Sequence, residues 1–135
     1  MQYDGGLSSE LCARKSATSL SFNLFGRFWR SNVPTKWKIN VYNSVCTGVL
    51  TSGTLALAPT SSYVSSIDSL HHKLLRRIML GKACSKNEDG IFKAMSNKQV
   101  CAASANGVSM ALLLRMLRLK WWQQVVKYPM SNVQV

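Results

Sequence analysis

The chain has 135 residues, and 47% of them are hydrophobic, so it holds enough apolar material for one modest core and lacks the composition of a disordered tail. Seventeen Lys and Arg stand against five Asp and Glu, which gives a formal net charge of +12. Such an excess repels itself unless an anion neutralises it, and RNA and DNA are the commonest polyanions. An anionic membrane surface, an acidic protein partner and a merely solubilising surface are the alternatives.

The cysteines Cys12, Cys46, Cys84 and Cys101 include no CxxC pair. We therefore expect no structural zinc, no other cofactor and no disulfide framework, and all four lie within predicted helices, where a free Cys acts as a small hydrophobe. The first ten residues carry acids where a signal peptide carries bases. The sequence thus predicts an intracellular protein, nuclear or cytoplasmic and not secreted, with residues 1–7 as a disordered or frayed start.

The first two helices are predicted on either side of Pro34. Residues 8–30 form the first, with Ser8 or Ser9 as its cap; its apolar positions are Leu11, Leu20, Leu24 and Phe28. Pro34 opens the second, and its apolar stripe consists of Trp37, Val41, Val45 and Val49. The long uncharged run 39–67 is broken by Gly48, Gly53 and Pro59, so we expect no membrane span and no membrane partner.

The third helix has the clearest period in the chain. It follows Pro59 and ends at Gly81; its apolar positions are Tyr63, Ile67, Leu70, Leu74 and Ile78. A polar loop over 82–95 comes next.

Two more helices make a pair over 96–130, followed by a tail at 131–135. Ser96 and Gln99 have the spacing of a capping box and open a short helix. The last helix runs from about Ser109 to Pro129, and its apolar side consists of Leu112, Met116, Leu119 and Val126. The predicted fold is all-α, an irregular bundle of about five helices with no sheet of consequence.

The sequence offers few candidate catalytic residues. The five acids do not converge as a two-metal site requires, and no Gly-rich phosphate loop is present. His71 and His72 are neighbours on a helix and point about 100° apart, so they cannot share one metal, and we expect one of them to face solvent. The sequence therefore predicts that the chain is not an enzyme.

Basic residues interleaved with aromatic ones are the strongest functional signal, because guanidinium and ammonium groups neutralise phosphates. Trp37 and Phe28 lie on apolar stripes and are expected in the core. The candidate nucleic-acid-binding residues are Arg27, Arg30, Lys36, Lys38, Lys73, Arg76, Arg77, Arg115, Arg118 and Lys120.

The serial order of these elements resembles the region after the palm in non-LTR (LINE-type) retrotransposon reverse transcriptases. Trp29-Arg30 ends a helix as in that family, and Lys38 to Val45 (KINVYNSV) is similar to its K-I-x-x-Y-N-S helix. Three more elements follow in the family's order: HHKLLRRIMLG, then NKQV, then RLKWWQQVVKYP. The likeness covers roughly residues 7 to 130, and each motif alone is degenerate.

The resemblance implies a helical thumb over 8–81, with the segment beyond it, that grips a template-primer duplex through its backbone. It also implies contact roles for Lys38, Lys73, Arg76 and Arg77. Two departures stand out. The family's L-L-Y-G-x-E-x-W segment is replaced by VLTSGTLA, which keeps the glycine and loses the aromatic and acidic groups, and the catalytic Tyr-x-Asp-Asp motif with its fingers and palm is absent.

Three hypotheses result. In the first, the chain is a non-catalytic remnant of a mobile element that binds RNA or DNA through phosphates. In the second, it is a helical packing piece whose partner was the missing palm and which has no independent function. In the third, it is an independent small basic nucleic-acid-binding protein.

Overall fold

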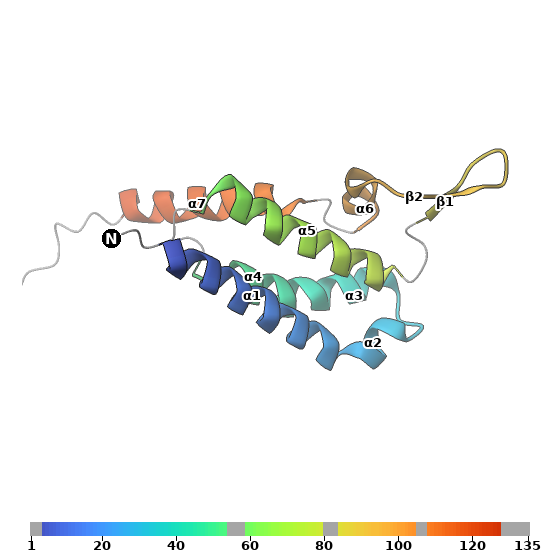
Figure 1. Ribbon diagram of the computed structural model, residues 1–135, viewed down its shortest axis with the longest axis horizontal. Helices are drawn as coiled ribbons and strands as arrows, with labels where there is room; N and C mark the ends of the chain where they lie inside the picture. Colours follow the sequence, from blue (N-terminus) through green and yellow to red (C-terminus); the bar gives the residue numbers. More distant parts are fainter. Residues whose placement is uncertain (1–3, 54–58, 80–83, 105–107, 128–135) are drawn as a thin grey trace, which may run out of the picture.

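The structure of the chain is a computed structural model that describes residues 4–53, 59–79, 84–104 and 108–127. These residues form seven α-helical segments, one π-helical turn and one hairpin (Figure 1), which confirms the all-α prediction. In chain order the elements are α1 (Asp4–Leu24), α2 (Gly26–Arg30), α3 (Thr35–Tyr42), η1 (Asn43–Thr47), α4 (Gly48–Thr51), α5 (Ser61–Ile78), β1 (Cys84–Lys86), β2 (Phe92–Ala94), α6 (Asn97–Ala103) and α7 (Met110–Lys127).

The first predicted helix is two helices, and its predicted apolar stripe is half right: Leu11 and Phe28 pack against the core, whereas Leu20 and Leu24 do not. α1 begins at Asp4, ahead of the expected cap, and breaks at Phe25 before α2. Leu20 and Leu24 are 64% and 78% exposed, whereas Phe22 is buried. The reason lies in Trp29, whose indole stacks on the Phe22 ring at 4.9 Å and donates a hydrogen bond to the Phe22 carbonyl at 2.7 Å.

The segments α3, η1 and α4 follow one another without a break and form one helical rod. Its buried line is Tyr42, Cys46 and Leu50, each fully buried, and the predicted core residue Trp37 is 63% exposed instead. Residues four apart drift by about 40° around an α-helix. The wider π turn of η1 reduces that drift, so the three side chains stay on one face.

The stripe predicted for α5 is confirmed. Tyr63, Ile67, Leu74 and Ile78 are buried and Leu70 is half-buried, while the Thr60 side chain caps the helix by accepting a hydrogen bond from the Tyr63 N–H. The predicted stop at Gly81 lies outside the described residues.

The predicted polar loop contains a short antiparallel hairpin. Cys84 pairs with Ala94 and Lys86 with Phe92, and Gly90 allows the turn through its φ of 80°. The sequence did not predict these strands, because three residues are too few to show an alternating pattern of apolar and polar residues. Cys84 is therefore exposed on a strand rather than placed in a helix, and Cys12 on α1 is exposed too.

The core consists of two adjoining clusters. One gathers Phe22, Trp29, Tyr42 and Leu74 with their neighbours between α1, α2, α3 and α5, and the other joins Leu50 of α4, the first turns of α5, and Met110 of α7. Leu70 packs against both. The bundle thus has its own interior across segments distant in sequence.

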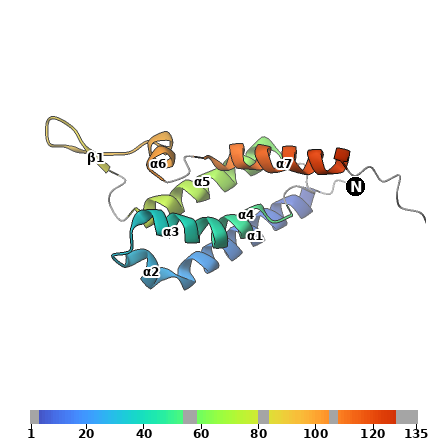
Figure 2. The ribbon, with the colours of Figure 1, turned by 180° about the vertical axis from the view of Figure 1, so that it is seen from behind.

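The last helix leaves the bundle. Met110 and Leu114 are buried, but from Arg115 onward the described side chains are exposed, apart from the half-buried Leu117. The predicted apolar side, consisting of Leu112, Met116, Leu119 and Val126, is between 44% and 75% exposed. Figures 1 and 2 show α7 running back along α5 and then beyond it, at the opposite end from the hairpin.

Candidate nucleic-acid interface

Two arginines from distant parts of the chain line one pocket. Arg30 of α2 and Arg77 of α5 line a concavity of about 420 Å³ together with Phe22 and Trp29. The Arg77 guanidinium carbon lies 5.4 Å from the centre of the Phe22 ring, and Arg30 Nε donates to the carbonyl of Gly26. Both arginines remain exposed, so most of their N–H groups face solvent. We call this site the arginine pocket.

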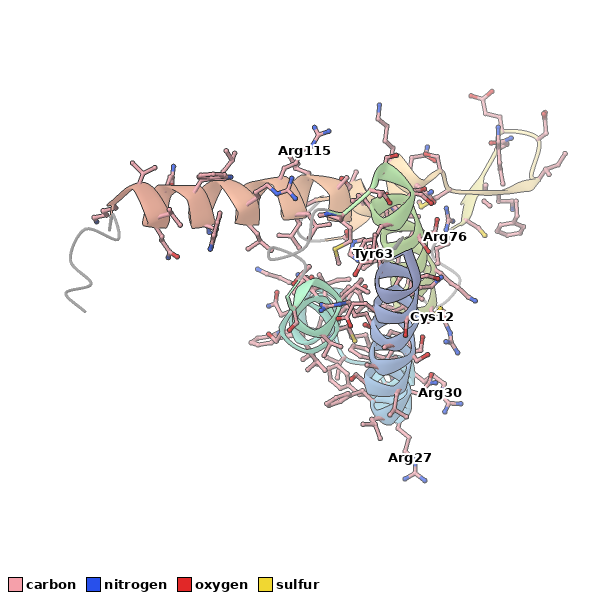
Figure 3. All side chains as sticks on the ribbon, turned by 60° about the vertical axis from the view of Figure 1, so that its left-hand side comes forward. Cys12, Arg27, Arg30, Tyr63, Arg76 and Arg115 are labelled. Carbon is pink, nitrogen blue, oxygen red and sulfur yellow. The ribbon has the colours of Figure 1, made fainter. Side chains whose placement is uncertain are left out.

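None of the residues that line the arginine pocket is an Asp or Glu. No Asp or Glu occurs between residues 11 and 67, or from residue 90 to the end of the chain. Arg27, exposed on the same short helix as Arg30, points away from the ribbon (Figure 3). The local field therefore favours an anion.

Three other predicted cations on the bundle differ in access. Lys36 on α3 and Lys73 on α5 are exposed. Arg76 is half-buried, and its Nη2 donates to the Met95 carbonyl at 2.6 Å and to Asn97 Oδ1 at 3.0 Å. Arg76 thus ties α6 to α5, and part of its hydrogen-bonding capacity is used within the fold.

Lys38 departs from its predicted role. Its side chain is only 3% exposed, and Nζ donates to the carbonyls of Trp29 at 2.7 Å and Ser31 at 2.6 Å. These carbonyls end α2, so the ammonium group satisfies acceptors that the helix end leaves free. The lysine joins α2 to α3, and two of its three N–H groups are used within the fold.

A second basic site lies in a groove between α5 and α7. Arg115 and Arg118 line it, across from Ser61 and Ser65 in the first turns of α5, and its volume is about 410 Å³. Asp68 also lines the groove, but its Oδ1 accepts the Met110 N–H at 2.9 Å and so fixes the start of α7. We call it the α5–α7 groove. Figure 3 shows Arg115 on α7, well away from Arg27 and Arg30.

Lys120 lies on α7 beyond the groove and is exposed. It is five residues after Arg115, about 140° further around the helix. It therefore faces away from the groove.

The histidine pair is buried, and the expectation that one histidine faces solvent is wrong. His71 and His72 are each 5% exposed. His71 Nδ1 lies 2.8 Å from the Tyr42 hydroxyl, and burial raises the pKa of Tyr42, so that hydroxyl stays protonated and can donate. Burial, and next the neighbouring His72, lower the pKa of His71 to about 4. His71 is therefore neutral at physiological pH.

His72 contacts a residue that the sequence did not single out for it. Its Nε2 lies 3.1 Å from Cys101 Sγ of α6, and its Nδ1 lies 2.7 Å from the Asp68 carbonyl. Burial raises the pKa of the Cys101 thiol, so the nucleophilic thiolate is disfavoured at neutral pH. The spacing of residues in the sequence could not predict the contact between His72 and Cys101, because the contact depends on how α6 packs against α5.

No family model, curated protein or solved structure matches the chain. Across the described residues, no group of three or more His, Cys, Asp and Glu side chains is placed to hold a metal ion. The helices in this part of the chain also lack the length and apolar character needed to cross a membrane.

Proposed function

We propose that the chain binds nucleic acid without sequence preference, through phosphate contacts made by its exposed arginines and lysines. The observation that carries the proposal is the convergence of Arg30 and Arg77, 47 positions apart in sequence, on one pocket without an acidic residue. A guanidinium presents a planar fork of N–H donors that suits two phosphate oxygens at once.

The resemblance to a reverse-transcriptase thumb supports the same proposal. In that family the region holds a template-primer duplex by its backbone, and the serial order of motifs is what the chain shares with it. We accordingly propose a thumb-like, non-catalytic grip with an RNA–DNA duplex as its natural ligand. Arg27 lies three residues before Arg30 and Lys73 four residues before Arg77, so each adds positive charge on the same helix face. Lys36 adds an exposed charge on α3, whereas Lys38 serves the fold.

The test is binding of the full chain to a mixed RNA–DNA duplex, followed by fluorescence anisotropy over a series of salt concentrations. The logarithm of affinity should fall with the logarithm of salt concentration with a slope of several units, since each phosphate contact contributes about 0.9. Arg30→Gln with Arg77→Gln should reduce that slope by about two units. Binding that is absent or insensitive to salt would contradict the proposal.

A matched control is available on the hairpin. Lys86→Gln with Lys93→Gln removes the same charge from two exposed strand positions far from the arginine pocket. This control should leave the salt slope nearly unchanged. Equal losses in the two double variants would mean that net charge, and not the arginine pocket, determines binding.

A second candidate function is a packing role, favoured by exposed apolar side chains on two helices. Leu24 is 78% exposed on α1 and Val126 is 75% exposed on α7. Such residues suit burial against a further protein surface, of which the palm in the resembling family is one example. A chain that binds no duplex but self-associates reversibly in analytical ultracentrifugation would favour this second function.

A further inference from the structure

The outer half of α7 continues the lining of the α5–α7 groove past the end of α5. Arg115, Arg118 and Trp122 occupy positions i, i+3 and i+7, and therefore share one face of the helix. Trp121 and Val125 lie on the adjacent row with Arg118. The face that lines the groove with arginines thus carries two tryptophans immediately beyond it, in the part of α7 that projects from the bundle (Figure 3).

Both tryptophans are available to a ligand. Trp121 is 44% exposed and Trp122 is 53% exposed, and their ring centres lie 5.3 Å apart with the ring planes at 72°. Trp122 lies about 6 Å along the helix axis from Arg118, at 1.5 Å per residue. A phosphate on the arginines and an unpaired base on an indole can therefore belong to the same short stretch of strand.

The position of the two arginines favours a nucleic-acid strand over an apolar ligand. Around the helix, Arg118 lies between the two tryptophans and Arg115 lies about 20° from Trp122, whereas a helix that inserts into a bilayer keeps its cations on the opposite face. Burying that face against an apolar protein surface would leave two guanidinium groups without partners. An anionic ligand with flat apolar rings satisfies both kinds of side chain.

We propose that the α5–α7 groove and the outer half of α7 bind single-stranded nucleic acid, with backbone phosphates on Arg115 and Arg118 and unpaired bases on Trp121 and Trp122. In a duplex the base faces are covered by their neighbours, so only unpaired bases can stack on an indole. This inference rests on the proposed nucleic-acid binding and adds to it a separate site for unpaired strand.

The experiment measures binding of the full chain to a labelled oligothymidine and, in parallel, to the RNA–DNA duplex. Trp121→Ala with Trp122→Ala should weaken oligothymidine binding by about fivefold to a hundredfold and leave duplex binding within about twofold. Trp121→Phe with Trp122→Phe should recover part of the loss, since a phenyl ring still stacks. Because these side chains are exposed, far-ultraviolet circular dichroism should show an unchanged fold.

Matched controls lie elsewhere on the surface. Trp37→Ala removes a tryptophan that is 63% exposed on α3 and should leave oligothymidine binding unchanged. Arg115→Gln with Arg118→Gln should weaken oligothymidine binding, whereas Lys93→Gln with Lys98→Gln, which removes two exposed charges on β2 and α6, should have a much smaller effect.

The outcomes separate this inference from the proposed function. Duplex binding that persists while the tryptophan variant binds oligothymidine like the natural chain overturns the inference alone. Failure to bind either nucleic acid overturns both. Loss of binding to phosphatidylserine vesicles, or loss of self-association, in a tryptophan variant with unchanged oligothymidine binding would assign this face to a membrane or to a second copy, and would also overturn the inference.

Discussion

Lys38 shows how a basic residue with the spacing of a ligand contact can belong to the interior. Its ammonium group donates to two carbonyls at the end of α2, and the side chain is 3% exposed. A charged donor in such a position contributes roughly 1.5–3 kcal/mol per hydrogen bond, because removing it leaves buried acceptors unsatisfied. The residue is better understood as a clamp between α2 and α3.

Lys38→Met should therefore destabilise the protein by about 2–4 kcal/mol, since methionine keeps much of the side-chain volume and removes both hydrogen bonds. Urea denaturation followed by circular dichroism measures the change. Lys36→Met, two residues earlier and exposed, is the control and should shift stability by less than about 0.5 kcal/mol. Similar effects of the two substitutions would contradict the conclusion that Lys38 stabilises the fold by joining α2 to α3.

His71 should make the fold sensitive to acid. Its pKa falls from 6.5 to about 4 in the fold, chiefly through burial. Between these two values the unfolded chain binds more protons than the folded chain, so stability falls as the pH is lowered from 6.5 toward 4. The full difference is on the order of 3 kcal/mol, and the pH dependence from this residue fades as the pH rises well above 6.5.

Urea denaturation at several pH values between 4 and 7 measures this loss. His71→Asn keeps a polar group near the Tyr42 hydroxyl and cannot take up a proton in this range. Its stability should fall less steeply with decreasing pH than that of the natural chain. Parallel curves for the two proteins would show that other groups cause the acid sensitivity.

At the scale of elements, the helices were predictable from spacing, but only one of the longer ones had a predictable buried face. α5 has a single apolar stripe, and the structure buries it. The rod of α3, η1 and α4 carries two stripes of the same period, one through Trp37 and the other through Tyr42. The second stripe was not recognised as buried because Tyr42 carries a polar hydroxyl. The hydrogen-bond partner of that hydroxyl, the ring of His71, comes from another helix.

α6 depends on its first turn. Ser96 accepts the Gln99 N–H at 3.3 Å, and the Gln99 side chain accepts the Ser96 N–H at 2.8 Å, as the spacing predicted. Ser96→Ala removes one half of this capping box and should lower stability by about 1 kcal/mol. Thermal denaturation checks the loss, with Ser9→Ala in the second turn of α1 as a control that should have little effect. An unchanged melting temperature for Ser96→Ala would mean that the contacts of α6 with α5, and not its cap, hold α6 in place.

At the scale of the whole molecule, the sequence predicted the type of ligand, an anion, but not which basic residues lie together in the fold. Composition alone indicated an anionic ligand, and nine of the ten proposed cations are exposed or half-buried. The pairing of Arg30 with Arg77, and of Arg115 with Arg118 against the start of α5, arises from tertiary packing. Periodicity within a helix carries no information about which distant helix will lie beside it.

Amide hydrogen exchange should divide the chain into two parts. The rods α1, α5 and α3–η1–α4 pack through two shared core clusters and should exchange together, at a rate set by global unfolding. The exposed outer half of α7 should exchange much faster, because few tertiary contacts hold it, and added oligothymidine should slow it selectively. Uniform protection along the chain would contradict this division.

The π turn of η1 should let the rod of α3, η1 and α4 lose one residue without disturbing its buried face, which a regular α-helix cannot do. A π turn holds one residue more than the α-helical turn it replaces, so its loss returns the rod to regular winding with both ends still facing the core. Deletion of the exposed Ser44 should consequently be accepted, whereas deletion of the exposed Ser69 in the regular α5 would turn every later side chain by about 100°. The turn is therefore the place in the rod where a one-residue deletion should be found in related chains.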